Sequence, residues 1–245
     1  GERLRKMLDE MNTRTHGMLA VERPTTTKTR ILARSQQVVR FDEENDEDIS
    51  GEEVARLEKA VKEAVSDAEA LVLEDYNKGV LVPSVIKSAI SAAKKRGIPI
   101  VVDPKYRNFF SYKGATIFKP NRRELEAALG AAVQIEQSEA LPETFRRLGV
   151  EYLLLTLGEM GMALLSADGE VGRIPTTARE VYDVVGAGDT VTAYLATMLA
   201  AGATAPEAAI VANFAAGVEV GKLGAATVTT AEVIDAFDSF QSSET

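Results

Sequence analysis

Short, continuous apolar runs alternate with helical patterns through the middle of the chain, and this alternation most constrains the fold. We expect strands over 70–73, 98–102, 116–118 and 152–156, with helices over 83–96, 122–129 and about 142–148 between them. Continuous apolar strands separated by helices are typical of a parallel sheet covered on both faces. The sequence therefore predicts an α/β fold, whose ligands should lie beyond the carboxyl ends of the strands.

The flanking segments predict the remaining elements. A helix is expected over 2–12, two or three antiparallel strands among 18–22, 25–34 and 37–41, and a solvated acidic loop over 42–53. Ser50 and Glu53 form a capping-box pattern that opens a helix reaching about residue 64. Strands over 162–166 and 170–175 flank a turn and should close the sheet antiparallel, before helices over 188–202, 206–220 and 230–240.

Composition excludes several classes of protein. The chain has 245 residues, 45% of them hydrophobic, which suits one large domain with a small appendage. A net charge of −9 gives no support for binding nucleic acid or an anionic membrane. The absence of cysteine excludes disulfides, and a single histidine, His16, excludes a histidine-based triad or metal cluster. No 18-residue apolar run or signal peptide is present, so we expect a cytoplasmic protein.

The stretch from Asp183 to Thr190 carries the strongest chemical signal. Gly186, Ala187 and Gly188 precede a buried helix, whose first turn leaves unpaired N–H groups and partial positive charge that can hold an anion. Asp189 follows at once and could take a proton from an attacking hydroxyl. The alternative is an ordinary glycine-rich turn with an acidic residue that stabilises the helix dipole.

Several polar segments follow the expected strands and should share one edge of the sheet: 74–79, 103–105, 119–124 and 157–161. Asn121 and Glu124 could order a hydrated Mg²⁺, or could simply cap the helix that follows. The small-residue loop 221–227 could admit a flat ring or allow tight helix packing. The cationic side chains of the early strands could bind an anionic substrate or protect a solvated edge: Lys28, Arg30, Arg34 and Arg40.

The motif at 183–190, together with Asn121-Arg122-Arg123-Glu124 upstream, resembles the ribokinase-like sugar kinases. Within that family, the segments 23–30, 36–42, 103–105 and 180–183 are similar to the bacterial D-glycero-β-D-manno-heptose 7-phosphate kinases. The resemblance implies one kinase domain with a three-layer parallel-sheet sandwich, a β-strand lid at about 17–42 and a core over 43–245. It also implies ATP-dependent phosphorylation of the anomeric hydroxyl to the 1,7-bisphosphate, in the supply of ADP-heptose for lipopolysaccharide.

The resemblance also assigns roles to individual residues. Asp189 would be the base and Gly186, Ala187 and Gly188 the anion hole, while Asp183 could hold a monovalent cation such as K⁺. The predicted nucleotide and Mg²⁺ residues are Asn121 and Glu124, with Thr156 and Gly158 near the phosphates and Asn213, Gly217 and the loop from Gly221 to Ala226 near adenine. The predicted sugar residues are Lys28, Arg30, Asp75 and Lys105. The lid strands would also join two subunits in a homodimer.

The chain departs from the family pattern in three places. Relatives usually carry a further strand-rich segment ahead of this point, with an early sugar-binding Asp, so that part of the usual domain is expected to be absent here. Tyr106 stands where Gly is usual, and Val185 where Thr is usual, although a backbone anion hole should survive the second change. A P-loop kinase is excluded because the chain has no Gly-x4-Gly-Lys-Ser/Thr run. The alternatives are a kinase for another sugar or sugar phosphate, or a non-catalytic nucleotide-binding fragment.

Overall fold

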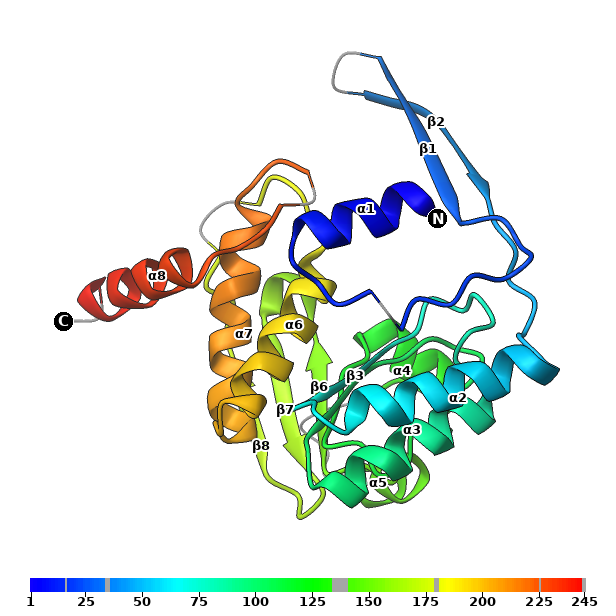
Figure 1. Ribbon diagram of the computed structural model, residues 1–245. Helices are drawn as coiled ribbons and strands as arrows, with labels where there is room; N and C mark the ends of the chain where they lie inside the picture. Colours follow the sequence, from blue (N-terminus) through cyan, green and yellow to red (C-terminus); the bar gives the residue numbers. More distant parts are fainter. Residues whose placement is uncertain (16, 34–35, 134–140, 179–180, 225, 244–245) are drawn as a thin grey trace.

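A six-stranded sheet forms the centre of the computed structural model (Figure 1). The structure describes residues 1–15, 17–33, 36–133, 141–178, 181–224 and 226–243. The strands lie in chain order: β3 (Leu71–Glu74), β4 (Ile100–Asp103), β5 (Ile117–Phe118), β6 (Tyr152–Thr156), β7 (Met162–Ser166) and β8 (Val171–Ile174). The first four are parallel, and β7 and β8 add antiparallel as a hairpin, which confirms the predicted order.

Helices cover both faces of this sheet, as the continuous apolar strands predicted. One face packs against α3 (Pro83–Arg96), α4 (Arg122–Leu129) and α5 (Leu141–Leu148), and the other against α6 (Ala187–Ala200) and α7 (Ala205–Val220). Alternate strand residues face the two layers: Val102, Phe118 and Leu153 lie in the first core, and Val101, Ile117 and Leu154 in the second. This two-residue alternation decides which polar side chains meet at the strand ends.

The remaining helices pack on the outside of these layers. The helix α2 (Gly51–Val65) contacts α3, and α8 (Thr230–Ser243) contacts the end of α7. Phe214 of α7 meets Phe237 and Phe240 of α8 edge to face, with ring centroids 5.3 and 5.6 Å apart. Among the described helices, none is long and apolar enough to cross a lipid bilayer.

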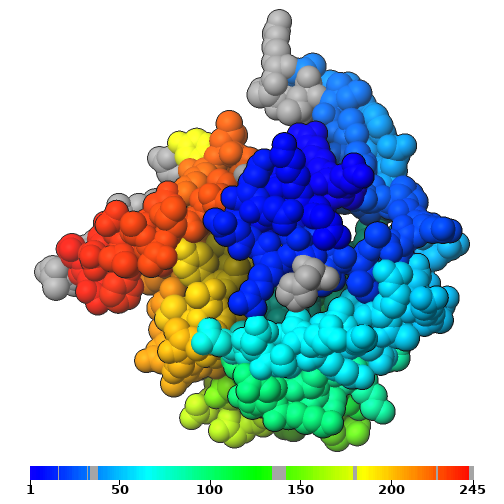
Figure 2. All heavy atoms as spheres, viewed as in Figure 1, coloured from blue at the N-terminus to red at the C-terminus, as the bar shows by residue number. Residues whose placement is uncertain are grey.

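The N-terminal region forms a separate layer. Figure 2 shows residues of α1 (Glu2–Glu10) and the segment after it, in dark blue, lying across this face between the C-terminal helices and α2. Beyond it, β1 (Thr27–Ala33) and β2 (Gln36–Glu43) pair antiparallel into a ribbon that stands away from the sheet (Figure 1). Of the two or three strands expected in this region, these two form; residues 18–22 form no strand, and Arg5 donates to the carbonyl of Met18 at 3.1 Å.

The acidic run at 42–53 begins within β2 and makes more contacts than the solvated loop predicted from the sequence. Asp42 bonds to Lys28 and Arg40, and Glu44 pairs with Lys28 and Lys78. Further along, Arg107 pairs with Asp46, with 2.6 Å between nitrogen and oxygen. The run therefore ties the ribbon to the polar loops at the carboxyl edge of the sheet. Arg34, predicted with the cationic strands, lies outside the described residues, as does His16.

Candidate active site

The amino end of α6 lies at the carboxyl edge of the sheet. Gly186 precedes the helix with φ of 102°, a left-handed conformation that favours glycine, and no side chain caps the helix. The first turn therefore presents N–H groups and dipole charge at residues 186–188 without a competing side-chain acceptor. A Cβ on Gly188 would lie 3.7 Å from the Lys119 ammonium and 3.8 Å from an Asp103 oxygen. The predicted anion hole thus faces the ends of β4 and β5.

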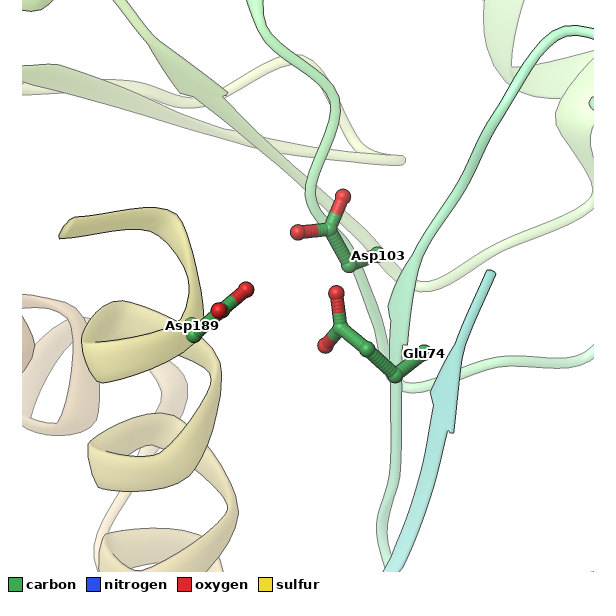
Figure 3. A group of neighbouring side chains, drawn as sticks. All are labelled: Glu74, Asp103 and Asp189. Atoms are coloured by element: carbon green, nitrogen blue, oxygen red, sulfur yellow. The ribbon is translucent and has the colours of Figure 1, made fainter. Parts of the chain in front are cut away.

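Three carboxylates converge in front of this helix end (Figure 3). Glu74 ends β3, Asp103 ends β4 directly beside it, and Asp189 approaches from the first turn of α6. One oxygen from each lies within 4.8 Å of the others, so the group could hold a metal ion. Strand alternation explains the meeting, since Glu74 and Asp103 sit on the face that α6 covers.

Neighbouring charges hold this cluster together. Asp103 is 95% buried and accepts a 2.7 Å bond from Lys119, while Lys105 lies 3.7 Å from its other oxygen. Burial, with the charge of Asp103, raises the pKa of Glu74 to about 8. Glu74 can therefore carry a proton near neutral pH, beside the carboxylate of Asp189.

Tyr76 supplies a hydrogen bond to the predicted base. Its hydroxyl donates to Asp189 at 3.1 Å, and burial, with the charge of Asp189, raises the pKa of Tyr76. The sequence reasoning noted the polar strand ends but gave no site role to Glu74, Tyr76, Asp103 or Lys119. The strand-end rule is the signal for them, and strand alternation determines which side of the sheet each residue faces.

Asn121 and Glu124 form the capping arrangement that the sequence left open. The Asn121 side chain accepts from the Glu124 N–H at 2.9 Å, and Glu124 accepts from the Asn121 N–H at 2.8 Å. The remaining Glu124 oxygen accepts from Lys105 at 2.7 Å. Thr156, at the end of β6, forms an isolated bridge to Asn121. The box thus fixes the orientation of both side chains at the sheet edge, beside Lys105 and Thr156.

Most of the predicted nucleotide residues line one cavity of about 590 Å³ beside the helix end. Its lining includes Asn121, Thr156, Gly158, Asn213 and Gly217, together with Ala187 and Gly188. The size falls within the range of small-molecule sites. Gly221 lines a neighbouring hollow of about 510 Å³, which shares Gly217 with the first. Ala225, in the predicted loop, lies outside the described residues.

Asn213 and Gly217 shape the wall of this cavity from α7. The buried Asn213 side chain donates to the Pro175 carbonyl at 2.9 Å, and Thr177 donates to the Asn213 carbonyl at 3.3 Å. A Cβ on Gly217 would lie only 2.5 Å from the Thr177 oxygen. These contacts draw the segment after β8 against α7 and leave no room for a larger residue at 217.

The predicted sugar residues are less closely gathered. Lys105 adjoins the cluster, but Lys28 bonds to Asp42 at 3.0 Å and Glu44 at 3.2 Å on the ribbon, and Arg30 lies exposed there. Asp75 is buried and accepts bonds from the Asn77 N–H at 2.7 Å and the Tyr112 hydroxyl at 2.8 Å. No hydrogen bond or ion pair between described residues joins the ribbon cations to the three carboxylates.

Asp183, predicted at a monovalent-cation site, lies in the turn just before the predicted anion hole. Its side chain accepts from the Val185 N–H at 3.0 Å, which tightens the turn into Gly186. The backbone N–H groups of Tyr182 and Asp183 both donate to the Val220 carbonyl, at 2.8 and 3.3 Å. The carboxylate of Asp183 is therefore fixed beside the carboxyl end of α7.

Comparison with known proteins agrees with this geometry. The family described as pfkB family carbohydrate kinase matches residues 1–232. The bifunctional protein HldE of Trichlorobacter lovleyi is 46% identical over 216 residues, which are 87% of this chain and 44% of that protein. HldE of Citrifermentans bemidjiense is 42% identical over 96% of this chain and 49% of its own length. The chain spans about half the length of the curated relatives it matches.

Solved structures share the fold. Phosphofructokinase-2 from Escherichia coli in complex with potassium aligns with a TM-score of 0.77 and 18% identity over 98% of this chain and 78% of its own. Ribokinase from Giardia lamblia aligns with a TM-score of 0.76 and 20% identity, over 98% of this chain and 79% of its own. Arabidopsis thaliana ribokinase complexed with ribose and ATP aligns with a TM-score of 0.62 and 26% identity, over 78% of this chain and 60% of its own. The predicted ribokinase-like α/β arrangement is therefore confirmed.

Proposed function

The chain belongs to the pfkB family of carbohydrate kinases, and on that premise we propose that it transfers the γ-phosphoryl group of ATP to the anomeric hydroxyl of D-glycero-β-D-manno-heptose 7-phosphate. One observation carries the proposal: Asp189 stands in the first turn of an uncapped helix whose N–H groups border a nucleotide-sized cavity. The HldE names of relatives sharing 42–46% identity support a heptose substrate. The product would be the 1,7-bisphosphate, formed in the cytoplasm as a precursor for ADP-heptose.

In the proposed reaction, Asp189 accepts the proton of the anomeric hydroxyl. At the same time the oxygen of that hydroxyl bonds to the γ-phosphorus of ATP. The bond from that phosphorus to the β-γ bridging oxygen breaks, and its electron pair leaves with ADP. The N–H groups at 186–188 hold the negative oxygens of the transferring group. Tyr76 holds the Asp189 carboxylate in place through its 3.1 Å bond. The protein forms no covalent bond to the substrate in this reaction. Its contribution to the rate is to position the reactants and to stabilise the charge of the transferring group.

We assign the nucleotide to the 590 Å³ cavity, with phosphates toward Thr156 and Gly158 and adenine toward Asn213, Gly217 and Gly221. Mg²⁺ is a hard cation that keeps several waters, and when bound it offsets phosphate charge. Asn121 and Glu124 would contact the Mg²⁺ through its bound waters. Their side-chain oxygens already accept hydrogen bonds within the capping box and from Lys105, so they are not free for direct coordination. The potassium complex of phosphofructokinase-2 supports a monovalent cation near Asp183.

We assign the sugar phosphate to the space between the carboxylate cluster and the ribbon, and propose that the segment 17–42 acts as a lid for the core at 43–245. Lys28, Arg30 and Lys105 supply positive charge for its 7-phosphate. Asp75 positions the loop after β3 through its bonds to Asn77 and Tyr112.

We also propose that the ribbon joins two subunits. Its strand register places Ile31 opposite Val39, and Thr29 opposite Phe41, on one face. Ile31, Val39 and Phe41 are 48%, 45% and 50% exposed, whereas the charged residues Lys28, Arg30 and Arg40 share the other face. A second copy of the lid would cover the apolar face.

An ATP-consumption assay with a panel of sugars and sugar phosphates tests the proposed reaction. We expect turnover with heptose 7-phosphate and loss of at least about a thousandfold in kcat for Asp189→Asn, with ATP binding retained. The exposed Asp238→Asn on α8 is the matched control and should keep full activity. Turnover of another phosphorylated sugar in preference to heptose 7-phosphate would contradict the proposed substrate but support the proposed kinase activity. Silence across the panel with ATP still bound would instead favour a nucleotide-binding fragment.

A further inference from the structure

A groove of about 700 Å³ lies on the solvent side of α3, at the end of the molecule opposite the ribbon (Figure 1). One wall is formed by α3 and the other by the segment 110–113 ahead of β5. The lining shares no residue with the cavity proposed for the nucleotide. It contains no acidic residue but several lysines: Lys87, Lys94, Lys95 and Lys113. Positive charge is therefore concentrated here on a chain whose net charge is −9.

These lysines differ from the rest of the chain in having no counter-charge. None of them forms an ion pair or a hydrogen bond with a described residue, whereas every other lysine of the chain lies 3.9 Å or less from a carboxylate oxygen. A chain rich in acidic residues thus leaves uncompensated only the lysines that line this groove. Like charges gathered without a partner repel one another, so the groove favours an anion from solution.

Two of the lysines are held in place by glycines. A Cβ on Gly114 would lie 2.6 Å from the Lys94 Nζ, so the Lys94 side chain reaches from α3 to the opposite wall. A Cβ on Gly149 would lie 3.2 Å from the Lys113 Cγ, so this side chain also lies along a glycine backbone. The Gly114 N–H donates to the Gly149 carbonyl at 2.6 Å, which joins the two points. Side chains that are already held lose less rotamer freedom when they bind a ligand.

The floor of the groove is apolar. Ile90 is buried and Phe110 is half-buried, and both pack against the core. The Arg147 guanidinium lies 4.4 Å from the centre of the Phe110 ring, which adds a further positive charge beside the floor. Ser91 and Ser111 place a hydroxyl group on each wall. Because apolar surface lowers the local dielectric constant, it strengthens the attraction between these cations and an anion.

We propose that this groove binds an oligophosphate anion, either free or as the phosphate chain of a nucleotide. Ammonium groups suit phosphate oxygens, since each offers three freely rotating donors. Lys87 and Lys94 are about 10 Å apart along the helix, so a chain of linked phosphates reaches both better than a single phosphate does. The volume is that of a small-molecule site, and Lys94 closes one end, so a compact ligand fits better than a polypeptide. The inference is independent of the proposed reaction.

Chemical labelling of lysines in the wild-type protein tests the site directly. N-hydroxysuccinimide acetate acetylates uncharged amino groups, and mass spectrometry gives the rate at each lysine. A bound anion favours the charged ammonium form, so saturating tripolyphosphate with EDTA should slow acetylation of Lys94 and Lys113 at least about fivefold relative to NaCl of equal ionic strength. Lys59 on α2, with a side chain 79% exposed, is the control in the same sample and should react at an unchanged rate. Unchanged rates at Lys94 and Lys113 would overturn the inference.

Variants of the groove test the same site by its affinity. The tripolyphosphate concentration that half-protects Lys87 reports binding in the groove alone and not at the anion hole. In the double variant Lys94→Gln, Lys113→Gln this concentration should rise at least about tenfold, because two charge-assisted contacts are lost. Lys59→Gln is the matched control, since it also removes one exposed lysine, and should leave the concentration unchanged. Equal protection of Lys87 in the double variant would contradict the proposed site.

Two further probes identify the source of the phosphate chain and test the alternative partner. Half-protection of Lys94 by ATP at a concentration at least about tenfold below that of tripolyphosphate would assign a nucleotide, because the base then adds its own contacts. Protection by tripolyphosphate at an equal or lower concentration would assign a free polyphosphate. A hexaglutamate peptide that protects Lys94 and Lys113 at lower concentrations than both would refute the oligophosphate site in favour of an acidic protein segment.

Discussion

At the scale of single residues, the proposed reaction centre depends on the charges around Asp189 as much as on Asp189 itself. Asp189 is one of three carboxyl groups whose oxygens lie within 4.8 Å, and two lysines and a tyrosine flank them. Crowded carboxylates cannot all ionise at little cost, so one takes up a proton more readily. Glu74 is that residue, because burial and the charge of Asp103 raise its pKa to about 8.

The raised pKa of Glu74 predicts a pH dependence of stability. The folded value of about 8 lies above the ordinary 4.5, so the folded state holds this proton more tightly. Stability contributed by Glu74 is therefore full below about pH 4.5 and is lost as pH rises toward 8. Glu74→Gln removes this loss, so its Tm should exceed that of the wild type at pH 8.5, with the difference shrinking toward pH 5, in scans with EDTA.

The exposed Glu69, just before β3, gives the control for this measurement. Glu69→Gln should follow the wild-type Tm at every pH, because the change removes a solvated charge. A Glu74→Gln curve parallel to the wild type would show that Glu74 is ionised throughout the range and would remove the proton-sharing account of the cluster.

At the scale of elements, the ribbon of β1 and β2 has two unlike faces. Ion pairs of Asp42 with Lys28 and Arg40 order the charged face, while Ile31, Val39 and Phe41 leave the other face apolar. A two-stranded ribbon is marginal alone in water, and an exposed apolar face usually marks an interaction surface. The apolar face of the ribbon is therefore the surface where we expect a partner to bind.

Phe41→Glu should break the proposed dimer. The new carboxylate would be buried in the lid interface opposite its copy, at a cost well above a surface substitution. We expect a dimer for the wild type and a monomer for the variant in sedimentation velocity at micromolar concentration. Ile234→Glu makes the same chemical change on α8 at a similar exposure, 54% against 50%, and should stay dimeric. If the Phe41→Glu protein is still a dimer, the dimer interface does not lie on this face of the ribbon.

At the scale of the whole molecule, local patterns predicted the sheet, its helices and the anion hole, because each lies within a short stretch of sequence. The meeting of Glu74, Tyr76 and Asp189 could not be read in that way, since 113 residues separate Tyr76 from Asp189. The approach of Glu219 to Gly186 also depends on how α7 packs against the turn before α6, which no local pattern shows. The sequence left open whether 18–22 would be a third strand; it is not, because strand propensity decides little for a segment that pairs with no neighbouring strand.

The cavity proposed for the nucleotide is likewise formed by packing, since α7, the segment after β8 and the end of β6 each form part of its wall. Gly217→Ala would place a Cβ 2.5 Å from the Thr177 oxygen and 3.2 Å from the Ala178 nitrogen, which pushes that segment. MgATP at about 100 times its dissociation constant adds about 2.7 kcal/mol of stability, or roughly 5–10 °C in Tm.

A tenfold weaker dissociation constant removes about 1.4 kcal/mol of that gain, so Gly217→Ala should lose roughly 3–5 °C of the MgATP shift at the same ligand concentration. Thermal scans with and without MgATP measure the difference. Gly172→Ala, on β8, is the control, because a Cβ there meets only the Leu164 carbonyl oxygen at an ordinary 3.8 Å. It should keep the full shift. A full MgATP shift in Gly217→Ala would place the nucleotide outside this cavity, because a ligand that fills the space beside Gly217 must sense the displaced segment.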